Sequence, residues 1–191
     1  MDCGETPRHL RYATGPWLAL NYRLKEAQSQ LEPAFIAIGS NLGDSRRIVT
    51  MAFERLQSLS TGPLLRSSLW ETAPVDCPPG SPNFINALAA IIPRPEETPE
   101  GLLDKLQAIE REFGRPPSQG ARNQPRLLDL DLIAFGQCAR STPRLVLPHP
   151  RAHLRRFVLG PLSEIAPDFI LPGQSRTVRE LLLHLDTQRQ P

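Results

Sequence analysis

The run LLDLDLIAF at residues 127–135 constrains the fold of this chain more than any other stretch. Its acidic and apolar residues alternate, and side chains alternate between the two faces of a β-strand. As a strand, the run places Asp129 and Asp131 side by side on one face, while Leu128, Leu130 and Leu132 point into a helix layer. Two carboxylates at such a short distance repel each other unless a positively charged group lies beside them. The run therefore predicts a strand of a half-covered sheet with a positive partner beside its acids.

The rest of the chain predicts further strands and helices. Strands are expected at 34–39, 64–72 and 83–92, of which the first is a short apolar run that ends in glycine. A helix capped by Asp44 is expected next to the first strand. Its buried face would carry Ile48, Met51, Ala52, Leu56 and Leu59.

A second helix is expected to begin at Thr98-Pro99 and to end at Gly114. Its buried stripe would carry Leu102, Leu103, Leu106, Ile109 and Phe113. Two C-terminal helical segments are expected near 151–165 and 177–186.

The order β-α-β-β-α-β is that of a ferredoxin-like α+β fold, an antiparallel sheet with helices on one face, to which the C-terminal helices are added. We expect this domain over residues 34–191 and a flexible N-terminal extension over 1–33, which show no sustained apolar period. A chain of 191 residues is long enough to bury one core. Many functions use this architecture, so the fold alone does not identify the function.

Charge and composition exclude several classes of protein. The formal net charge of +2 is too small to indicate binding to nucleic acid or to a membrane surface. No apolar run has membrane-spanning length, and the N-terminus lacks a secretory signal pattern. Cys3, Cys77 and Cys138 lack the spacing of a zinc site or a disulfide framework. We therefore expect a cytoplasmic monomer that binds small molecules.

Magnesium suits the aspartate pair, because it takes one or two carboxylates and leaves its other positions to water and phosphate oxygens. Two such ions can clamp a phosphoryl group during its transfer. Arg115 and Arg126 bracket the loop that leads to the strand, which favours a polyphosphate ligand. The alternative is that the acids are the solvated face of a half-exposed strand and the arginines are surface charges.

Several segments occur in an order that resembles one enzyme family. They are FIAIGSNLGD, SSLWETAPV, NFINA, IEREFGR, PRLLDLDLIAFG, LPHP and RRFVLGPLSEIAP. The chain resembles 6-hydroxymethyl-7,8-dihydropterin pyrophosphokinase, a folate-pathway family, over residues 34–185. IGSNLG and the aspartate run are specific for this family when both occur in this order, whereas neither motif is specific when it occurs alone.

The resemblance implies transfer of pyrophosphate from ATP to the pterin hydroxymethyl oxygen, with attack at the β-phosphorus and release of AMP. It implies that Asp129 and Asp131 hold two magnesium ions, and that Arg115 and Arg126 act in catalysis with them. The ATP-binding positions that it implies are Gln107, Glu110, Arg115, Arg126, His149 and Arg155. The pterin-binding positions are Thr72, Val75, Phe84, Asn86 and Phe157.

The chemistry of the pterin positions is suitable. A flat heterocycle favours aromatic stacking, and an amide offers both a donor and an acceptor to its edge. The alternative is that Phe84 and Phe157 are core residues.

The sequence departs from the family in the loop before the aspartate strand. Asn123 and Gln124 stand where Trp and Gly are frequent, and Pro117 and Ser118 stand where further basic residues are frequent. These differences bear on loop closure and rate more than on the type of reaction.

Three other classes remain as alternatives: a D-x-D glycosyltransferase, a catalytically weak pterin- or nucleotide-binding paralogue, and a nucleic-acid-binding module. The chain lacks a Rossmann glycine fingerprint, which disfavours the first. The candidate sheet face is acidic, which disfavours the third.

Overall fold

The computed structural model describes residues 32–114 and 125–188, which belong to one compact unit, Leu31–Pro191. Its centre is an antiparallel sheet in the order β2-β4-β1-β5, in which β3 also pairs with β4. The strands are β1 (Ala34–Ser40), β2 (Leu65–Arg66), β3 (Trp70–Thr72), β4 (Phe84–Ile91) and β5 (Asp129–Phe135). The predicted class, α+β with an antiparallel sheet, is confirmed.

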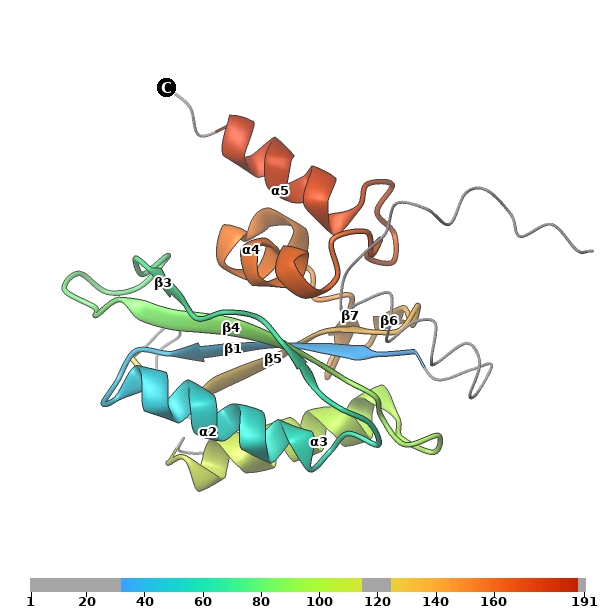
Figure 1. Cartoon of the computed structure of the whole chain (residues 1–191), viewed down its shortest axis with the longest axis horizontal. Coiled ribbons are helices and arrows are strands. Elements are labelled where there is room, and N and C mark those ends of the chain that lie inside the picture. Colours follow the sequence, from blue (N-terminus) through green and yellow to red (C-terminus); the bar gives the residue numbers. More distant parts are fainter. Residues whose placement is uncertain (1–31, 115–124, 189–191) are drawn as a thin grey trace, which may run out of the picture. The chain divides into compact units, whose positions relative to one another are not determined.

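Helices cover both faces of this sheet (Figure 1). The first pair, α2 (Ser45–Gln57) and α3 (Pro99–Glu112), packs on one face. On the other face, α4 (Arg156–Ile165) packs on β4, and α5 (Val178–Thr187) packs on α4. A short hairpin of β6 (Arg140–Ser141) and β7 (Val146–Leu147) and the 3-10 turn η2 (Ala152–Leu154) lead into α4. None of the described helices combines the length and the apolar character that crossing a membrane requires.

The two sides of β5 differ as its alternation predicts. Leu128, Leu130 and Leu132 are buried in the core together with Leu102 and Leu106 of α3. The aspartates therefore face the opposite side of the sheet, where α4 packs. A functional site at the aspartates must lie between the sheet and the start of α4.

Both predicted helix starts are confirmed by their capping hydrogen bonds. The Asp44 carboxylate accepts the N–H of Arg47, and the Thr98 hydroxyl accepts the N–H of Gly101. At the end of α3, Gly114 has a φ of +89°, the left-handed conformation that glycine adopts most readily.

The predicted buried face of α2 was partly wrong. Its buried residues are Val49, Ala52, Phe53 and Leu56, which have the i, i+3, i+4, i+7 spacing of one stripe. Met51, which we expected inside, is 42% exposed. The helix has more apolar residues than one face holds, so its sequence does not define which edge is covered.

The predicted strand 64–72 is interrupted at Ser67 and Ser68, and forms β2 and β3 instead. The Ser67 hydroxyl accepts the N–H of Leu88 at 2.9 Å. The N–H of Ser68 leaves the sheet and donates to Glu164 of α4 at 2.7 Å. Side chains therefore satisfy polar groups of the backbone where regular pairing stops.

Candidate active site

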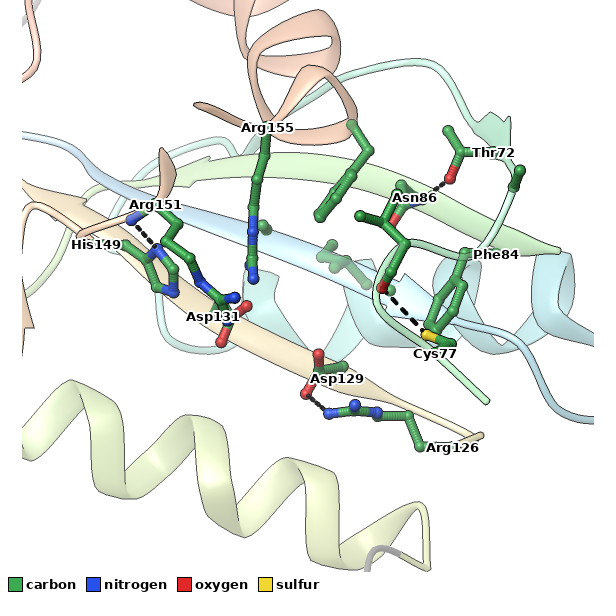
Figure 2. Close-up of a pocket in the computed structure, with 16 residues that line it drawn as sticks. Thr72, Cys77, Phe84, Asn86, Arg126, Asp129, Asp131, His149, Arg151 and Arg155 are labelled. Atoms are coloured by element: carbon green, nitrogen blue, oxygen red, sulfur yellow. Dashed lines mark hydrogen bonds and ion pairs between the residues drawn. The ribbon is translucent and has the colours of Figure 1, made fainter. Parts of the chain in front are cut away.

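A cavity of about 220 Å³ opens on the face of the sheet that carries α4 (Figure 2). Its walls come from the central strands, the proline-rich loop after β3, the turn at His149 and the start of α4. It brings together predicted site residues from distant parts of the chain: Thr72, Val75, Phe84, Asn86, Arg126, Asp129, Asp131, His149, Arg155 and Phe157.

Strand pairing places Gly39 at the middle of the cavity floor. In the sheet, Gly39 lies opposite Asn86 of β4 on one side and Asp129 of β5 on the other. A Cβ atom on Gly39 would lie 3.4 Å from Asn86 Oδ1 and 3.8 Å from Asp129 Cβ. A single glycine therefore separates an acidic half of the cavity from an amide and aromatic half.

In the acidic half, Arg126 Nη1 lies 2.9 Å from Asp129 Oδ1. The two side chains are 21% and 24% exposed, so this ion pair is partly shielded from water. The arginine is a positive partner for the acidic pair, as the alternation of β5 led us to expect. Asp131 lies on the same face of the strand, two residues further along.

The protein supplies few ligands for a metal ion at this position. Among the described residues, no group of three or more His, Cys, Asp and Glu side chains could hold a metal. Two carboxylates fit magnesium, which takes its remaining ligands from water and phosphate oxygens.

Asn41 holds two walls of the cavity together. This side chain is 3% exposed. Its Oδ1 accepts the backbone N–H of Arg126 at 2.8 Å, and the backbone N–H of Asn41 donates to the Arg126 carbonyl at 3.2 Å. Its Nδ2 donates to the carbonyl of Pro82, in the proline-rich loop, at 3.4 Å. The buried amide thus links the approach to β5 with the loop on the opposite wall.

In the amide and aromatic half, Asn86 Nδ2 donates to the Thr72 hydroxyl at 2.7 Å (Figure 2). Because this bond fixes the amide, Oδ1 is left as an acceptor on the side of Gly39. Phe84 and Phe157 are half-buried and line the cavity, so the alternative that they are core residues is wrong.

The third wall is basic. The N–H of His149 donates to the carbonyl of Ile133 at 2.8 Å, which fixes the turn against β5. The ring Nδ1 accepts the N–H of Arg151 at 3.2 Å, so a neutral ring carries its proton on Nε2. Burial lowers the pKa of His149 to about 4, and the charges of Arg155 and Arg151 contribute to this shift. At neutral pH the ring is therefore a neutral hydrogen-bond donor.

Two predicted ATP-binding residues, Gln107 and Glu110, do not line this cavity, and a third, Arg115, is not among the described residues. Gln107 is exposed on α3. Glu110 is 5% exposed, and its carboxylate accepts the N–H of Leu130 at 2.8 Å, which ties α3 to β5. Arg115, together with Pro117, Ser118, Asn123 and Gln124, lies outside the described residues.

The cavity is also lined by residues that we did not predict from the sequence, notably Gly39, Cys77 and Arg151. The glycine at the end of the first apolar run was a signal for close approach to a ligand, and the cluster of basic residues after His149 was a signal for Arg151. Cys77 had no signal beyond its place in the proline-rich loop.

Comparison with known proteins shows which family the chain matches. Residues 35–167 match the protein family described as 7,8-dihydro-6-hydroxymethylpterin-pyrophosphokinase (HPPK). The 2-amino-4-hydroxy-6-hydroxymethyldihydropteridine pyrophosphokinase of Pseudomonas aeruginosa is 39% identical over 153 residues, which cover 80% of this chain and 91% of that protein. The protein of the same name from Haemophilus influenzae is 39% identical over 150 residues, which cover 78% and 90%.

Solved structures show the same fold. The chain aligns with Plasmodium falciparum HPPK-DHPS, crystallised with pteroate, at a TM-score of 0.65 and 13% identity. The alignment covers 84% of this chain and 43% of that one, so this chain spans less than half of that longer protein.

Proposed function

The chain belongs to the 7,8-dihydro-6-hydroxymethylpterin-pyrophosphokinase family, and from this membership we propose which residues of the cavity serve each substrate. The enzyme transfers pyrophosphate from ATP to 6-hydroxymethyl-7,8-dihydropterin in folate biosynthesis. The hydroxymethyl oxygen bonds to the β-phosphorus, the bond from that phosphorus to the oxygen of the α-phosphate breaks, and AMP leaves. The hydroxyl proton is released in the same step.

In our proposal the amide and aromatic half binds the pterin. Asn86 presents Oδ1 to the donor groups of the heterocycle edge, and Thr72 holds the amide in that orientation. Phe84 and Phe157 stack on its faces, and Val75, which is 53% exposed, covers the entrance. This half has no carboxylate among its described lining residues, as suits a neutral ring.

The acidic half and the basic wall bind the triphosphate. Arg126 and Arg155 offer planar guanidinium groups, which bind phosphate oxygens through two parallel hydrogen bonds. His149 donates one further hydrogen bond from Nε2. These donors stabilise negative charge on the phosphate oxygens as AMP leaves. The ATP-binding roles of Gln107, Glu110 and Arg115 remain predictions from the resemblance.

Asp129 and Asp131 would hold magnesium, and two ions are the number that we propose. When bound, magnesium neutralises phosphate oxygens and aligns the attacking and leaving groups. The aspartates stand on a strand whose other face is packed in the core, so their positions are rigid.

The register of β1 carries this proposal. Gly39 is paired with Asn86 on one side and with Asp129 on the other, so the two binding halves lie on adjacent strands of one sheet face. A hydroxymethyl group on a pterin beside Asn86 then points toward phosphates held above the aspartates. Proximity of this kind is a main source of catalysis in phosphoryl transfer.

We also propose the ferredoxin-like description of the fold, which is supported by the strand order β5-β1-β4-β2 and by the shared face of α2 and α3. A monomeric state and a cytoplasmic location complete the proposal. Analytical ultracentrifugation of the full chain tests the first, and fractionation of the source cells tests the second.

The decisive experiment is incubation of the protein with ATP, magnesium and 6-hydroxymethyl-7,8-dihydropterin, followed by chromatography of the nucleotides. We expect AMP in an amount equal to the pterin diphosphate formed. An Asp131→Asn variant that keeps its circular dichroism spectrum serves as the matched control, and we expect it to be inactive. Formation of ADP instead of AMP would show a simple kinase and overturn the assignment.

A further inference from the structure

Arg151 lines the cavity, although the resemblance to the family gave it no role. Its backbone position is well fixed. Its N–H donates to His149 Nδ1, and its carbonyl accepts the N–H of Leu154 at 3.1 Å. The next residue, Ala152, is 1% exposed and so anchors the turn in the protein interior. A side chain on such a turn starts from a defined place and reaches the cavity without reorganising the backbone.

The position of this turn relative to β5 puts Arg151 and Arg126 at opposite ends of the acidic pair. Arg126 lies three residues before Asp129 and is paired with it. The turn that carries Arg151 is joined to Ile133, two residues after Asp131, by the hydrogen bond from His149. Figure 2 shows the two arginines at opposite ends of the row of acids. A ligand that lies over the aspartates therefore has one arginine at each end.

The arginines around the start of α4 differ in the partners that the described residues give them. Arg156, only five residues away, pairs with Asp186 at 2.8 Å. None of the ion pairs among residues 32–114 and 125–188 includes Arg151. Arg151 and Arg155 line the same cavity. Burial first and the charge of Arg151 second lower the pKa of Arg155, whereas Asp131, Asp129 and Asp76 act in the opposite direction. Neighbouring cations repel, and an anionic ligand between them relieves that repulsion.

We propose that Arg151 is a further nucleotide-binding residue, which contacts the phosphates of ATP from the end of the cavity opposite Arg126. A guanidinium group matches a phosphate because it offers two donors in one plane. Adenosine and the pterin carry no such charge, so the contact is specific for the polyphosphate. This inference rests on the proposed division of the cavity between the two substrates.

The test compares Arg151→Gln and Arg151→Lys with the native enzyme. Arg94→Gln is the matched control, because this substitution removes the same charge and Arg94 is an exposed arginine beyond the far end of β4. Calorimetry measures binding of α,β-methylene-ATP with magnesium. In this analogue a carbon replaces the oxygen between the α- and β-phosphorus atoms. The bond that the reaction breaks is therefore absent, and no turnover occurs.

We expect Arg151→Gln to weaken binding of the analogue about tenfold, which is the scale of one charge-assisted contact. Arg151→Lys should recover part of the loss, and Arg94→Gln should stay within about twofold of the native value. Binding of the pterin to the free enzyme should not change in any of the variants.

Two results would count against the proposal in different ways. If Arg151→Gln binds the analogue as the native enzyme does, Arg151 is a solvated surface charge and the rest of the proposed site stands. If the native enzyme itself binds neither the analogue nor the pterin, the proposed division of the cavity fails, and the role of Arg151 fails with it.

Discussion

Arg126 has a partner in the protein as well as a proposed partner in the substrate. Its Nη1 is 2.9 Å from Asp129 Oδ1, and phosphate oxygens would compete for the same guanidinium group. Lysine would keep the charge but lose the planar pair of donors. We expect Arg126→Lys to lower kcat on the order of a hundredfold, the scale for one preorganised donor, and to raise the KM for ATP by less.

Steady-state kinetics with varied ATP measures this effect, and Arg94→Lys is the control for a change that does not touch the cavity. An unchanged kcat would mean that Arg126 acts as a simple surface charge, and would transfer the role to another arginine such as Arg115.

His149 gives the site a pH dependence with a definite sign. Its pKa falls from 6.5 to about 4 in the folded protein, first because of burial and then because of Arg155 and Arg151. Below pH 6.5 the unfolded chain therefore binds a proton that the folded protein does not bind. The free energy of unfolding should fall as the pH drops from 6.5 to about 4, and this residue should have no effect above that range.

An NMR titration of the His149 ring tests the shift directly, with His149→Gln used to assign the signal. Urea midpoints at pH 7 and pH 5 test the linkage, and we expect a smaller difference between them in His149→Gln. A ring that titrates near its ordinary value would contradict the prediction.

The site residues differ in how far the sequence determines them. Asp129 and Asp131 could be predicted because the period of a strand is local, and two alternating acids must share a face. Arg151 and Arg156 look alike in sequence, yet Arg156 lies over the Trp70 ring at 5.3 Å and pairs with Asp186, whereas Arg151 lines the cavity. The direction of each side chain depends on the turn before α4 and on distant strands, so no local pattern could separate them.

At the scale of elements, the sequence predicts best what neighbouring residues decide. The caps at Asp44 and Thr98 and the alternation of β5 each depend on a few adjacent residues, and the structure confirms them. The break between β2 and β3 depends on Glu164, which lies 96 residues from Ser68 along the chain. A contact of that range cannot be inferred from the strand alone.

Glu164 should therefore stabilise the junction of the sheet with α4. Its carboxylate accepts hydrogen bonds from the Ser68 N–H, the Ser68 hydroxyl and the Trp70 indole, each at 2.7 Å. Burial opposes its ionisation, but these hydrogen bonds outweigh burial and lower the pKa of Glu164. We expect Glu164→Ala to lower the free energy of unfolding by about 1–2 kcal/mol at pH 7, because the lost bonds lie near the surface.

Urea unfolding followed by tryptophan fluorescence measures this loss, with Glu96→Ala as an exposed control. Because the folded pKa lies below the ordinary value, the stabilisation is present above that value and disappears as the pH falls through the folded pKa. Equal stability of Glu164→Ala and Glu96→Ala at pH 7 would show that the hydrogen bonds contribute nothing.

At the scale of the whole molecule, the functional unit should begin near Leu31. Among residues 32–114 and 125–188, those that line the cavity lie at Ala37 or later, and the compact unit runs from Leu31 to Pro191. We expect deletion of residues 1–30 to leave kcat/KM within about threefold, roughly 0.6 kcal/mol in the activation free energy. Activity and solubility of the shortened chain measure this, and loss of either would show that the N-terminal residues contribute to the enzyme.

The hydrogen bonds of Asn41 have a thermodynamic consequence. This one amide contacts the main chain of Arg126 on the nucleotide side and the carbonyl of Pro82 on the pterin side. A ligand that shifts either segment changes the energy of the other through the same residue. Coupling between two binding sites is reciprocal, so any factor by which ATP changes the affinity for the pterin is the factor by which the pterin changes the affinity for ATP. Through Asn41, the affinity for each substrate therefore depends on whether the other is already bound. The total binding free energy of the ternary complex is the same for either order of binding.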